Sequence, residues 1–499
     1  MITTDRMAAV DANAAALGVP RKQLMESSGN AVAREVRAVA EPGATVALVC
    51  GRGNNGGDAL VAARFLGGYE VTVHLLGRPE TIRTDIAREN WAALGNAEIP
   101  RETVTDSRDF NLIDSDGDDP DVVVDAMLGS GVSGGLREPE RTAAAAINAS
   151  DATVIAVDVP SGIDADTGEP TGDSADDTAA PADGDATTDP VAVDADRVVT
   201  FHDEKPGLAG LDAETTVADI GIPTAAERFT GPGDLLGLDR DPDSHKGDNG
   251  EVLVVGGGPY AGAPTLAALA ALRTGADLVR VACPESVASE VQGFSPNLIV
   301  RALPGDRVGP SRAERVASLA AASDAVVLGP GLGDGDGTRE FVREFLTEFE
   351  GRAVVDADAL RAVPEVDTGA DLVCTPHQGE LVDMGGETAP DPDERAELVR
   401  EFAADLGHAL LVKGAVDVIS DGDDVRLNRT GNPGMTVGGT GDVLAGTVGA
   451  LAAATDPFHA AAVGAYAVGR AGDAAADANG NGLVATDLPD RLPEAMRNE

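Results

Sequence analysis

A glycine-rich loop in the C-terminal half carries the residues best suited to chemistry: Gly438-Gly439-Thr440-Gly441-Asp442, followed by an amphipathic helical stretch. Glycines allow backbone amides to approach an anion, and the N-terminus of the following helix adds a partial positive charge. Asp442 lies at the mouth of this anion site. It is either a helix N-cap or a general base that removes the proton from a hydroxyl attacking a phosphoryl group. The loop alone does not decide between these interpretations.

Four further turns in the same half follow short apolar runs and could complete the site. They contain the glycine run Gly256–Gly258, the loop Gly329–Gly333, His377 with Glu380, and Lys413. Lys413 is one of only four lysines in the chain, and a point cation suits a nucleotide phosphate. Each of these segments by itself could simply be a turn, in which glycine, proline and polar residues are common. Together they favour a phosphoryl-transfer site.

The N-terminal half has a second set of polar loops. The run Gly51–Asp58 follows one apolar stretch, and two later stretches end in Asp125 and Asp158, the latter just before Ser161. Asn55, Asp125 and Ser161 offer amide, carboxylate and hydroxyl oxygens without His or Cys, a combination that suits a hard cation rather than zinc. For any one of these three, turn capping remains the alternative.

Apolar strand candidates alternate with alanine-rich helical stretches in both halves. In the first half they are Thr45–Cys50, Val71–Leu76, Val122–Asp125, Thr153–Asp158 and Arg197–Phe201; in the second they are Val252–Val255, Leu278–Ala282, Ala325–Leu328, Ala353–Asp356, Leu372–Thr375 and Ala409–Val412. This alternation predicts parallel sheets covered by helices on both faces, with ligands outside the carboxyl ends of the strands. The fold class is α/β, with two three-layer domains.

Two irregular segments interrupt this alternation. Gly231–Asp243, rich in Gly, Pro and Asp, lies between the two strand series and is the predicted linker, so the domains are 1–228 and 240–499. Gly172–Asp196 contains eight aspartates and no basic residue, and it predicts an acidic surface loop.

The formal net charge of -48 excludes nucleic acid as the main partner, because phosphate backbones require a basic surface. It suggests a salt-adapted host, where screening relieves the self-repulsion. The cysteines Cys50, Cys283 and Cys374 have no metal-binding spacing and are expected to be buried in a reducing compartment. No signal peptide or apolar run of the ~20 residues needed for a membrane span is evident. We expect a cytoplasmic protein, without a membrane partner, that forms a homo-oligomer.

The motifs of the C-terminal half resemble those of the NAD(P)H-hydrate dehydratase family, which has the ribokinase-like fold. The resemblance rests on His245-Lys246-Gly247, Gly329-Pro330-Gly331-Leu332-Gly333, Thr375-Pro376-His377, Lys413-Gly414-Ala415 and Gly439-Thr440-Gly441-Asp442, in this order across nearly the whole domain. It implies repair of NADHX and NADPHX, in which water has added to the reduced nicotinamide ring. The ring hydroxyl is phosphorylated and phosphate is then eliminated.

The resemblance also implies residue roles. Asp442 would be the catalytic base, and the hydrated dinucleotide would contact Ala263, Gly331, Gly333, His377 and Asp442. ADP, which would leave as AMP, would bind Lys413, Gly414, Ala415, Val416, Asp417 and Gly441. Mg²⁺ is expected as a cofactor without named protein ligands. Asp417 departs from the family pattern, which usually has Thr there; an acid beside a phosphate is unfavourable unless it points away or meets a metal.

The N-terminal motifs resemble the NAD(P)H-hydrate epimerase family, whose Rossmann-like domain is commonly fused ahead of the dehydratase. The match extends to Lys205-Pro206-Gly207. It implies that Asn55, Asp125 and Ser161 bind K⁺ and that Asp158 is the acid/base. The dinucleotide-binding residues would be Asn54, Asn55, Gly56, Gly57, Asp58, Gly129, Ser130, Gly131, Val132, Ser133, Gly134, Gly135 and Asp158.

Two other functions are compatible with parts of these motifs. A vitamin or sugar kinase shares the C-terminal fold, but the kinases that resemble this sequence usually have Asn where His377 follows Thr-Pro. An N-terminal scaffold for RNA-processing proteins would not need the polar set of Asn55, Asp125, Asp158 and Ser161. We therefore expect a bifunctional enzyme in which the epimerase converts R-NAD(P)HX to the S form that the dehydratase uses.

Overall fold

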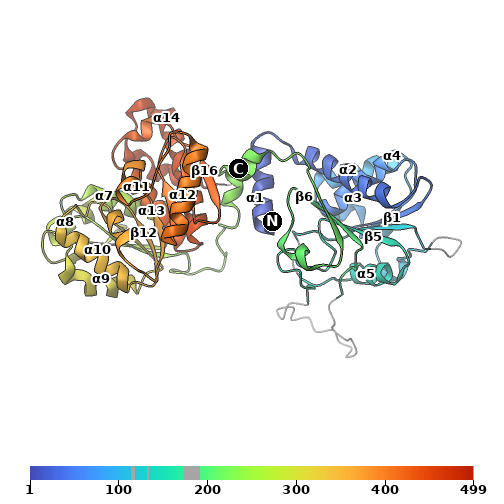
Figure 1. Ribbon diagram of the computed structural model, residues 1–499, viewed down its shortest axis with the longest axis horizontal. Coiled ribbons are helices and arrows are strands. Elements are labelled where there is room, and N and C mark those ends of the chain that lie inside the picture. Colours follow the sequence, from blue (N-terminus) through green and yellow to red (C-terminus); the bar gives the residue numbers. More distant parts are fainter. Residues whose placement is uncertain (114–118, 132–133, 173–190, 498–499) are drawn as a thin grey trace. The chain divides into compact units, whose positions relative to one another are not determined.

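The computed structural model describes residues 1–113, 119–131, 134–172 and 191–497, in two compact units, Met1–Thr224 and Ala225–Glu499 (Figure 1). The division falls a few residues before the predicted linker, whose first part packs inside the second unit. The Thr230 amide donates to the Leu427 carbonyl (2.8 Å), and Leu235 belongs to that unit's core. Most of the predicted acidic loop lies outside the described residues.

The first unit is built on a parallel sheet with the strand order β3-β2-β1-β4-β5-β6-β7. Its strands are β1 (Thr45–Cys50), β2 (Glu70–Leu76), β3 (Arg101–Val104), β4 (Val122–Ala126), β5 (Thr153–Val157), β6 (Arg197–Phe201) and β7 (Glu214–Ala218); its helices are α1 (Thr4–Ala16), α2 (Arg21–Val39), α3 (Asn54–Phe65), α4 (Asp85–Asn96) and α5 (Glu140–Ala149). All five predicted strands are confirmed. The edge strands β3 and β7 were missed because most of their side chains are exposed or half-buried and they contain no apolar run.

The strand order reverses between β1 and β4, and ligands bind at such a switch point in open α/β sheets. The loops after these two strands approach closely there. A Cβ atom on Gly51 would lie 1.8 Å from the Met127 carbonyl oxygen, so no larger residue fits. The N-terminal polar loops are therefore placed where a ligand crevice is expected.

The second unit contains a nine-stranded sheet with the order β10-β9-β8-β11-β12-β13-β14-β15-β16. Its strands are β8 (Glu251–Val255), β9 (Leu278–Pro284), β10 (Ile299–Leu303), β11 (Ala325–Leu328), β12 (Arg352–Val355), β13 (Asp371–Cys374), β14 (Ala409–Val412), β15 (Asp417–Ser420) and β16 (Val425–Asn428). β10 to β14 are parallel, but β15 and β16 are antiparallel. The prediction of a wholly parallel sheet is wrong there, because the four-residue turn from β14 to β15 is too short for a crossover.

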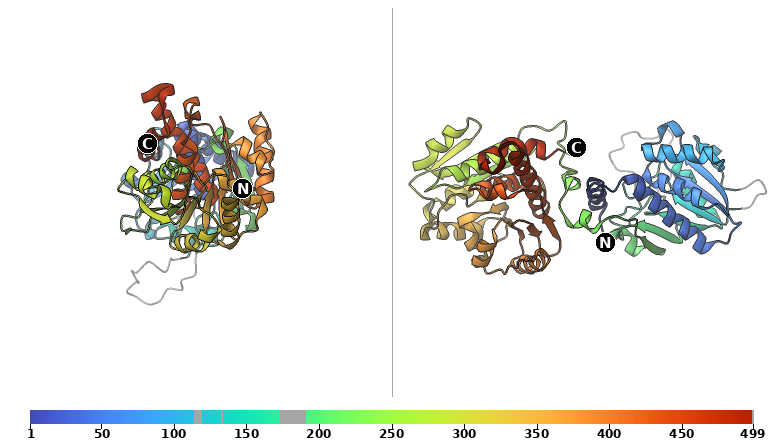
Figure 2. Two further views of the ribbon diagram at one scale, coloured as in Figure 1. Left: turned by 90° about the vertical axis from the view of Figure 1, so that its left-hand side faces the viewer. Right: turned by 90° about the horizontal axis from the view of Figure 1, so that it is seen from above.

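Helices cover both faces of this sheet (Figures 1 and 2). The helices are α6 (Thr224–Arg228), α7 (Gly262–Thr274), α8 (Glu285–Phe294), α9 (Ala313–Ala320), α10 (Asp336–Glu348), α11 (Gln378–Asp383), α12 (Pro392–Leu406), α13 (Thr440–Ala452), α14 (Pro457–Asn479) and α15 (Leu492–Ala495). Alternate residues of β8 face opposite cores: Val252 and Val254 pack with α7, α13 and α14, whereas Leu253 and Val255 pack with α9, α10 and α12. Among the described residues, no helix is long and apolar enough to cross a membrane.

Candidate active sites

In the second unit, the glycine turns after β8 and β11 meet at the switch point of the sheet. A Cβ atom on Gly331 would lie 3.2 Å from the Cβ atom of Ala263, so these two predicted dinucleotide-binding residues are neighbours. The Gly333 amide donates to the Asp358 carboxylate (2.8 Å). The two turns thus lie side by side at the carboxyl ends of β8 and β11.

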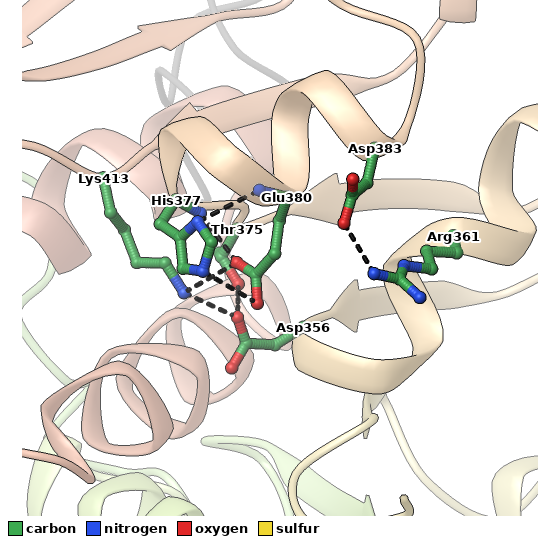
Figure 3. Close-up of polar contacts among 7 residues, drawn as sticks. All are labelled: Asp356, Arg361, Thr375, His377, Glu380, Asp383 and Lys413. Carbon is green, nitrogen blue, oxygen red and sulfur yellow. Dashed lines mark hydrogen bonds and ion pairs between the residues drawn. The ribbon is translucent and has the colours of Figure 1, made fainter. Parts of the chain in front are cut away.

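Lys413 directly follows β14, and its ammonium faces Asp356 and Glu380 (Figure 3). Its ammonium nitrogen lies 2.9 Å from Asp356 Oδ1 and 3.9 Å from Glu380 Oε2. A Cβ atom on Gly441 would lie 3.3 Å from the same nitrogen, which places the cation beside the first turn of α13. The structure therefore brings Lys413 and Gly441, both predicted to bind the nucleotide, into one place.

Asp442 occupies the first turn of α13, but it is not the N-cap. The N-cap residue is Gly439, whose φ of 101° lies in the left-handed region that favours glycine. Burial and the nearby negative charge of Asp356 raise the pKa of Asp442 to about 7, against the opposing charge of Lys413. A carboxylate with this pKa can accept a proton near neutral pH, which favours the general-base interpretation.

His377 caps α11 and stands next to Lys413. Its Nδ1 accepts a hydrogen bond from the Glu380 amide (3.0 Å), and its own amide donates to the Glu380 carboxylate (2.8 Å). The His377 side chain is 61% exposed, and the backbones of His377 and Lys413 form an isolated bridge. The ring is therefore held by its inner nitrogen and accessible to a ligand.

Asp417 begins β15, directly after the turn 413–416. One carboxylate oxygen accepts from the Gly414 amide and the other from the Asn428 side chain, both at 2.9 Å. Burial raises the pKa of Asp417, although these hydrogen bonds act in the opposite direction. Its carboxylate closes the turn that also contains Ala415 and Val416, which accounts for an acid at this position.

Asp356 was not among the predicted site residues. This residue ends a predicted strand but received no role, and the structure places it at 2% exposure beneath Lys413. Its signal was an aspartate directly after a buried apolar strand, the pattern that singled out Asp125 and Asp158. The sequence did not indicate that Asp356 would bind Lys413.

In the first unit, Asp125 and Ser161 form a buried pair. Ser161 donates to Asp125 through its hydroxyl (2.6 Å) and its amide (2.8 Å), and the hydroxyl accepts from the Leu128 amide. Burial raises the pKa of Asp125 to about 6, although hydrogen bonds from Ser161 and Met127 oppose the rise. This pair concentrates oxygen atoms at the carboxyl end of β4.

Asn55 lies in the first turn of α3, against Gly129. A Cβ atom on Gly129 would lie 3.1 Å from the Asn55 amide carbon. Both amide atoms of Asn55 are buried and, within the described part of the chain, have no hydrogen-bond partner. Since buried polar groups are nearly always satisfied, this amide is expected to meet a ligand or an ion.

Asp158 is held on both carboxylate oxygens. Oδ2 accepts from the Ser130 hydroxyl (2.6 Å) and amide (3.0 Å), and Oδ1 lies 3.1 Å from the ammonium of Lys205, which is 1% exposed. Burial raises the pKa of Asp158, but Lys205 and the Ser130 hydrogen bonds outweigh it, so the pKa is lowered. Its φ of 68° is unusual for a residue with a side chain and often marks a functional position.

The other predicted dinucleotide-binding residues of this unit differ in accessibility. Asn54 is exposed, whereas Gly56, Gly57 and Asp58 are buried in the start of α3. Burial, and then the negative charges of Asp158 and Asp11, raise the pKa of Asp58 well above its usual value. Gly131, Gly134 and Gly135 are at least partly exposed; Val132 and Ser133 lie outside the described residues.

Two family models match the chain. The model described as NAD(P)H-hydrate dehydratase matches residues 252–494, and the model described as YjeF-related protein N-terminus matches residues 21–207. Each match falls within one of the two compact units.

Curated relatives match over the full length. Proteins described as bifunctional NAD(P)H-hydrate repair enzyme Nnr are 44% identical in Methanothermobacter thermautotrophicus (98% of this chain, 94% of the relative), 43% in Pyrobaculum aerophilum (99% and 98%) and 41% in Methanopyrus kandleri (100% and 97%). A solved structure, described as the ADP/ATP-dependent NAD(P)H-hydrate dehydratase from Bacillus subtilis co-crystallised with ATP and Mg²⁺, is 30% identical, with a TM-score of 0.46, over 52% of this chain and 92% of its own.

Proposed function

The chain belongs to the family of bifunctional NAD(P)H-hydrate repair enzymes, and we propose that its two units divide the repair reactions between them. The unit Met1–Thr224 epimerises R- and S-NAD(P)HX, and the unit Ala225–Glu499 dehydrates S-NAD(P)HX to NAD(P)H with ADP as the phosphoryl donor. The observation that carries the second assignment is Asp442, with a pKa of about 7, in the helix turn that Lys413 also faces.

Dehydration begins with transfer of the proton of the ring hydroxyl to Asp442. The hydroxyl oxygen attacks the terminal phosphorus of ADP, and the bond to AMP breaks. Lys413 and the amides of the anion loop stabilise the charge on the transferring group. Phosphate then leaves the ring carbon with electron push from the ring nitrogen, and loss of a proton from the adjacent carbon restores the double bond. Hydroxide is a poor leaving group, so phosphorylation is the means of removing water.

His377 and the neighbours Ala263 and Gly331 are proposed to contact the hydrated dinucleotide, with Gly333 beside them. The turn Gly414–Val416 would carry the nucleotide, with Asp417 closing that turn. Mg²⁺ is proposed to enter bound to the nucleotide phosphates, its usual partners in such sites, and to neutralise their charge. No side chain of the chain is assigned to it.

Epimerisation is proposed to use Asp158 as the base, because Lys205 keeps its carboxylate ionised. Asp158 removes the proton of the ring hydroxyl, a carbonyl forms, and the ring carbon–nitrogen bond breaks. The nitrogen then adds back to either face of the carbonyl, and the proton returns from Asp158 to oxygen. Either epimer results, with atoms and electrons conserved. The start of α3, Asn54–Asp58, and the segment Gly129–Gly135 would bind the dinucleotide.

The oxygen set of Asn55, Asp125 and Ser161 is proposed to hold K⁺. Its fit rests on a donor set of oxygens alone and on the buried Asn55 amide, which has no hydrogen-bond partner among the residues that the structure describes. K⁺ would balance the buried charge of Asp125 and order the loop that carries Gly129. The charge of -48 further supports a host with high internal salt.

The test incubates the full chain with mixed R- and S-NAD(P)HX, Mg²⁺, K⁺ and either ADP or ATP. Reduced-nicotinamide absorbance should recover from both epimers, with AMP as the product from ADP. Recovery without a nucleotide would overturn the dehydratase assignment, and so would phosphorylation of a thiamin precursor in its place. Faster turnover with ATP than with ADP would correct the donor alone.

A further inference from the structure

Asp356 directly follows β12, the central strand of the second sheet, and accepts two hydrogen bonds on a single oxygen. Its Oδ1 accepts from Lys413 Nζ (2.9 Å) and from the Thr375 hydroxyl (2.8 Å), as Figure 3 shows. The residue is 2% exposed. A buried carboxylate held by two donors from neighbouring strands has a fixed position, and so has the cation that it binds.

Lys413 is held between carboxylates and the anion loop. Asp356 makes the short contact, Glu380 lies at 3.9 Å, and Gly441 borders the ammonium from α13. A free lysine side chain has four rotatable bonds and would lose considerable entropy on binding a phosphate. The contact with Asp356 already fixes the Lys413 side chain in the folded protein. This entropy is therefore lost during folding, and not when the nucleotide binds.

Asp356 also acts on the catalytic carboxylate. The charged groups that face Asp442 are Asp356 at the end of β12 and Lys413 at the end of β14. After burial, the negative charge of Asp356 is the larger cause of the raised pKa of Asp442, and Lys413 opposes it. Asp356 thus contacts Lys413 and repels the negative charge of Asp442, the two side chains proposed to act in phosphoryl transfer.

We propose that Asp356 is a positioning residue for the phosphoryl transfer: it holds the Lys413 ammonium at the nucleotide site and directs its own negative charge toward Asp442. This inference rests on the proposed function of Asp442 and Lys413. Asp356 itself reacts with neither substrate, and its effects are transmitted through these two residues.

Three charge variants test the proposal, each assayed as the full chain with S-NADHX, ADP and Mg²⁺ over a range of pH. D356N should move the acid limb of kcat to lower pH by about one unit, because the repelling charge is gone, and should raise KM for ADP about tenfold. K413M should move the same limb to higher pH. The double variant D356N/K413M removes both charges, and its limb should return towards that of the unaltered chain.

D383N is the matched control. Asp383 pairs with the exposed Arg361 at 2.6 Å in the same region, apart from the site (Figure 3), so its limb and its KM should stay unchanged. Lower activity of D356N with an unmoved limb would mean that Asp356 is merely structural and would overturn the inference. If D356N does not fold, a K413M limb that fails to rise overturns it equally.

D442N separates this inference from the proposed function. An active D442N would refute the base assignment itself. An inactive D442N together with an unmoved D356N limb would refute only the role of Asp356.

Discussion

Replacement of Lys205 by methionine tests the buried ion pair of the epimerase unit. The Lys205 ammonium is bound by Asp158 Oδ1 (3.1 Å) and by the carbonyls of Phe201 (2.9 Å) and Asp203 (3.3 Å). Lys205→Met keeps most of the unbranched side chain and removes the charged ammonium. It leaves the Asp158 carboxylate buried without its cation.

Removal of one partner from a buried pair costs about 3–5 kcal/mol of unfolding free energy, because the remaining charge stays desolvated. We expect a loss in this range. Trp91 is the only tryptophan and lies in α4, so its fluorescence in a urea titration follows the first unit. The double variant K205M/D158N lacks both charges and should recover more than half of the loss.

Epimerisation should respond in a defined direction. Without Lys205, the largest influence opposing burial is lost and the pKa of Asp158 rises, so the acid limb of epimerisation should move to higher pH. A loss below ~1 kcal/mol, or an equal loss in the single and double variants, would refute the electrostatic explanation.

Three further predictions concern other parts of the chain. Asp442→Asn should lower the rate of dehydration by about 10²–10⁴-fold and leave epimerisation intact. In the unaltered chain, the rate of dehydration should fall as the pH falls through about 7, where Asp442 gains its proton. Absorbance assays on the separate epimers measure both reactions. Gly446→Ala should destabilise the second unit by about 1–3 kcal/mol in urea unfolding followed by circular dichroism, because the new Cβ atom would lie 1.9 Å from the Ala267 carbonyl oxygen of α7; a neutral result would show that α13 can shift. Exchange of K⁺ for Li⁺ should slow epimerisation alone, since Asn55, Asp125 and Ser161 belong to the first unit; an equal effect on dehydration would argue against K⁺ at this site.

Local patterns in the sequence were enough to predict the buried strands. All eleven predicted strands exist, because each is a run of apolar residues that both faces of a covered sheet require. β3, β7, β10, β15 and β16 escaped detection. β3, β7, β10 and β16 are edge strands, and exposed or half-buried polar residues interrupt their apolar patterns. β15 is largely buried, but its four residues include Asp417 and Ser420 and leave no apolar run to detect.

Local signals in the sequence, namely glycines, a rare lysine and acids at strand ends, were enough to predict candidate site loops. Which charges meet depends on the three-dimensional arrangement of the strands. Lys413 binds Asp356 across 57 positions of the chain, and Lys205 reaches Asp158 from the end of another strand. These contacts depend on the order of strands in a sheet, which brings distant strand ends together. The pKa of a buried carboxylate follows from that arrangement and from burial, and no local pattern encodes either.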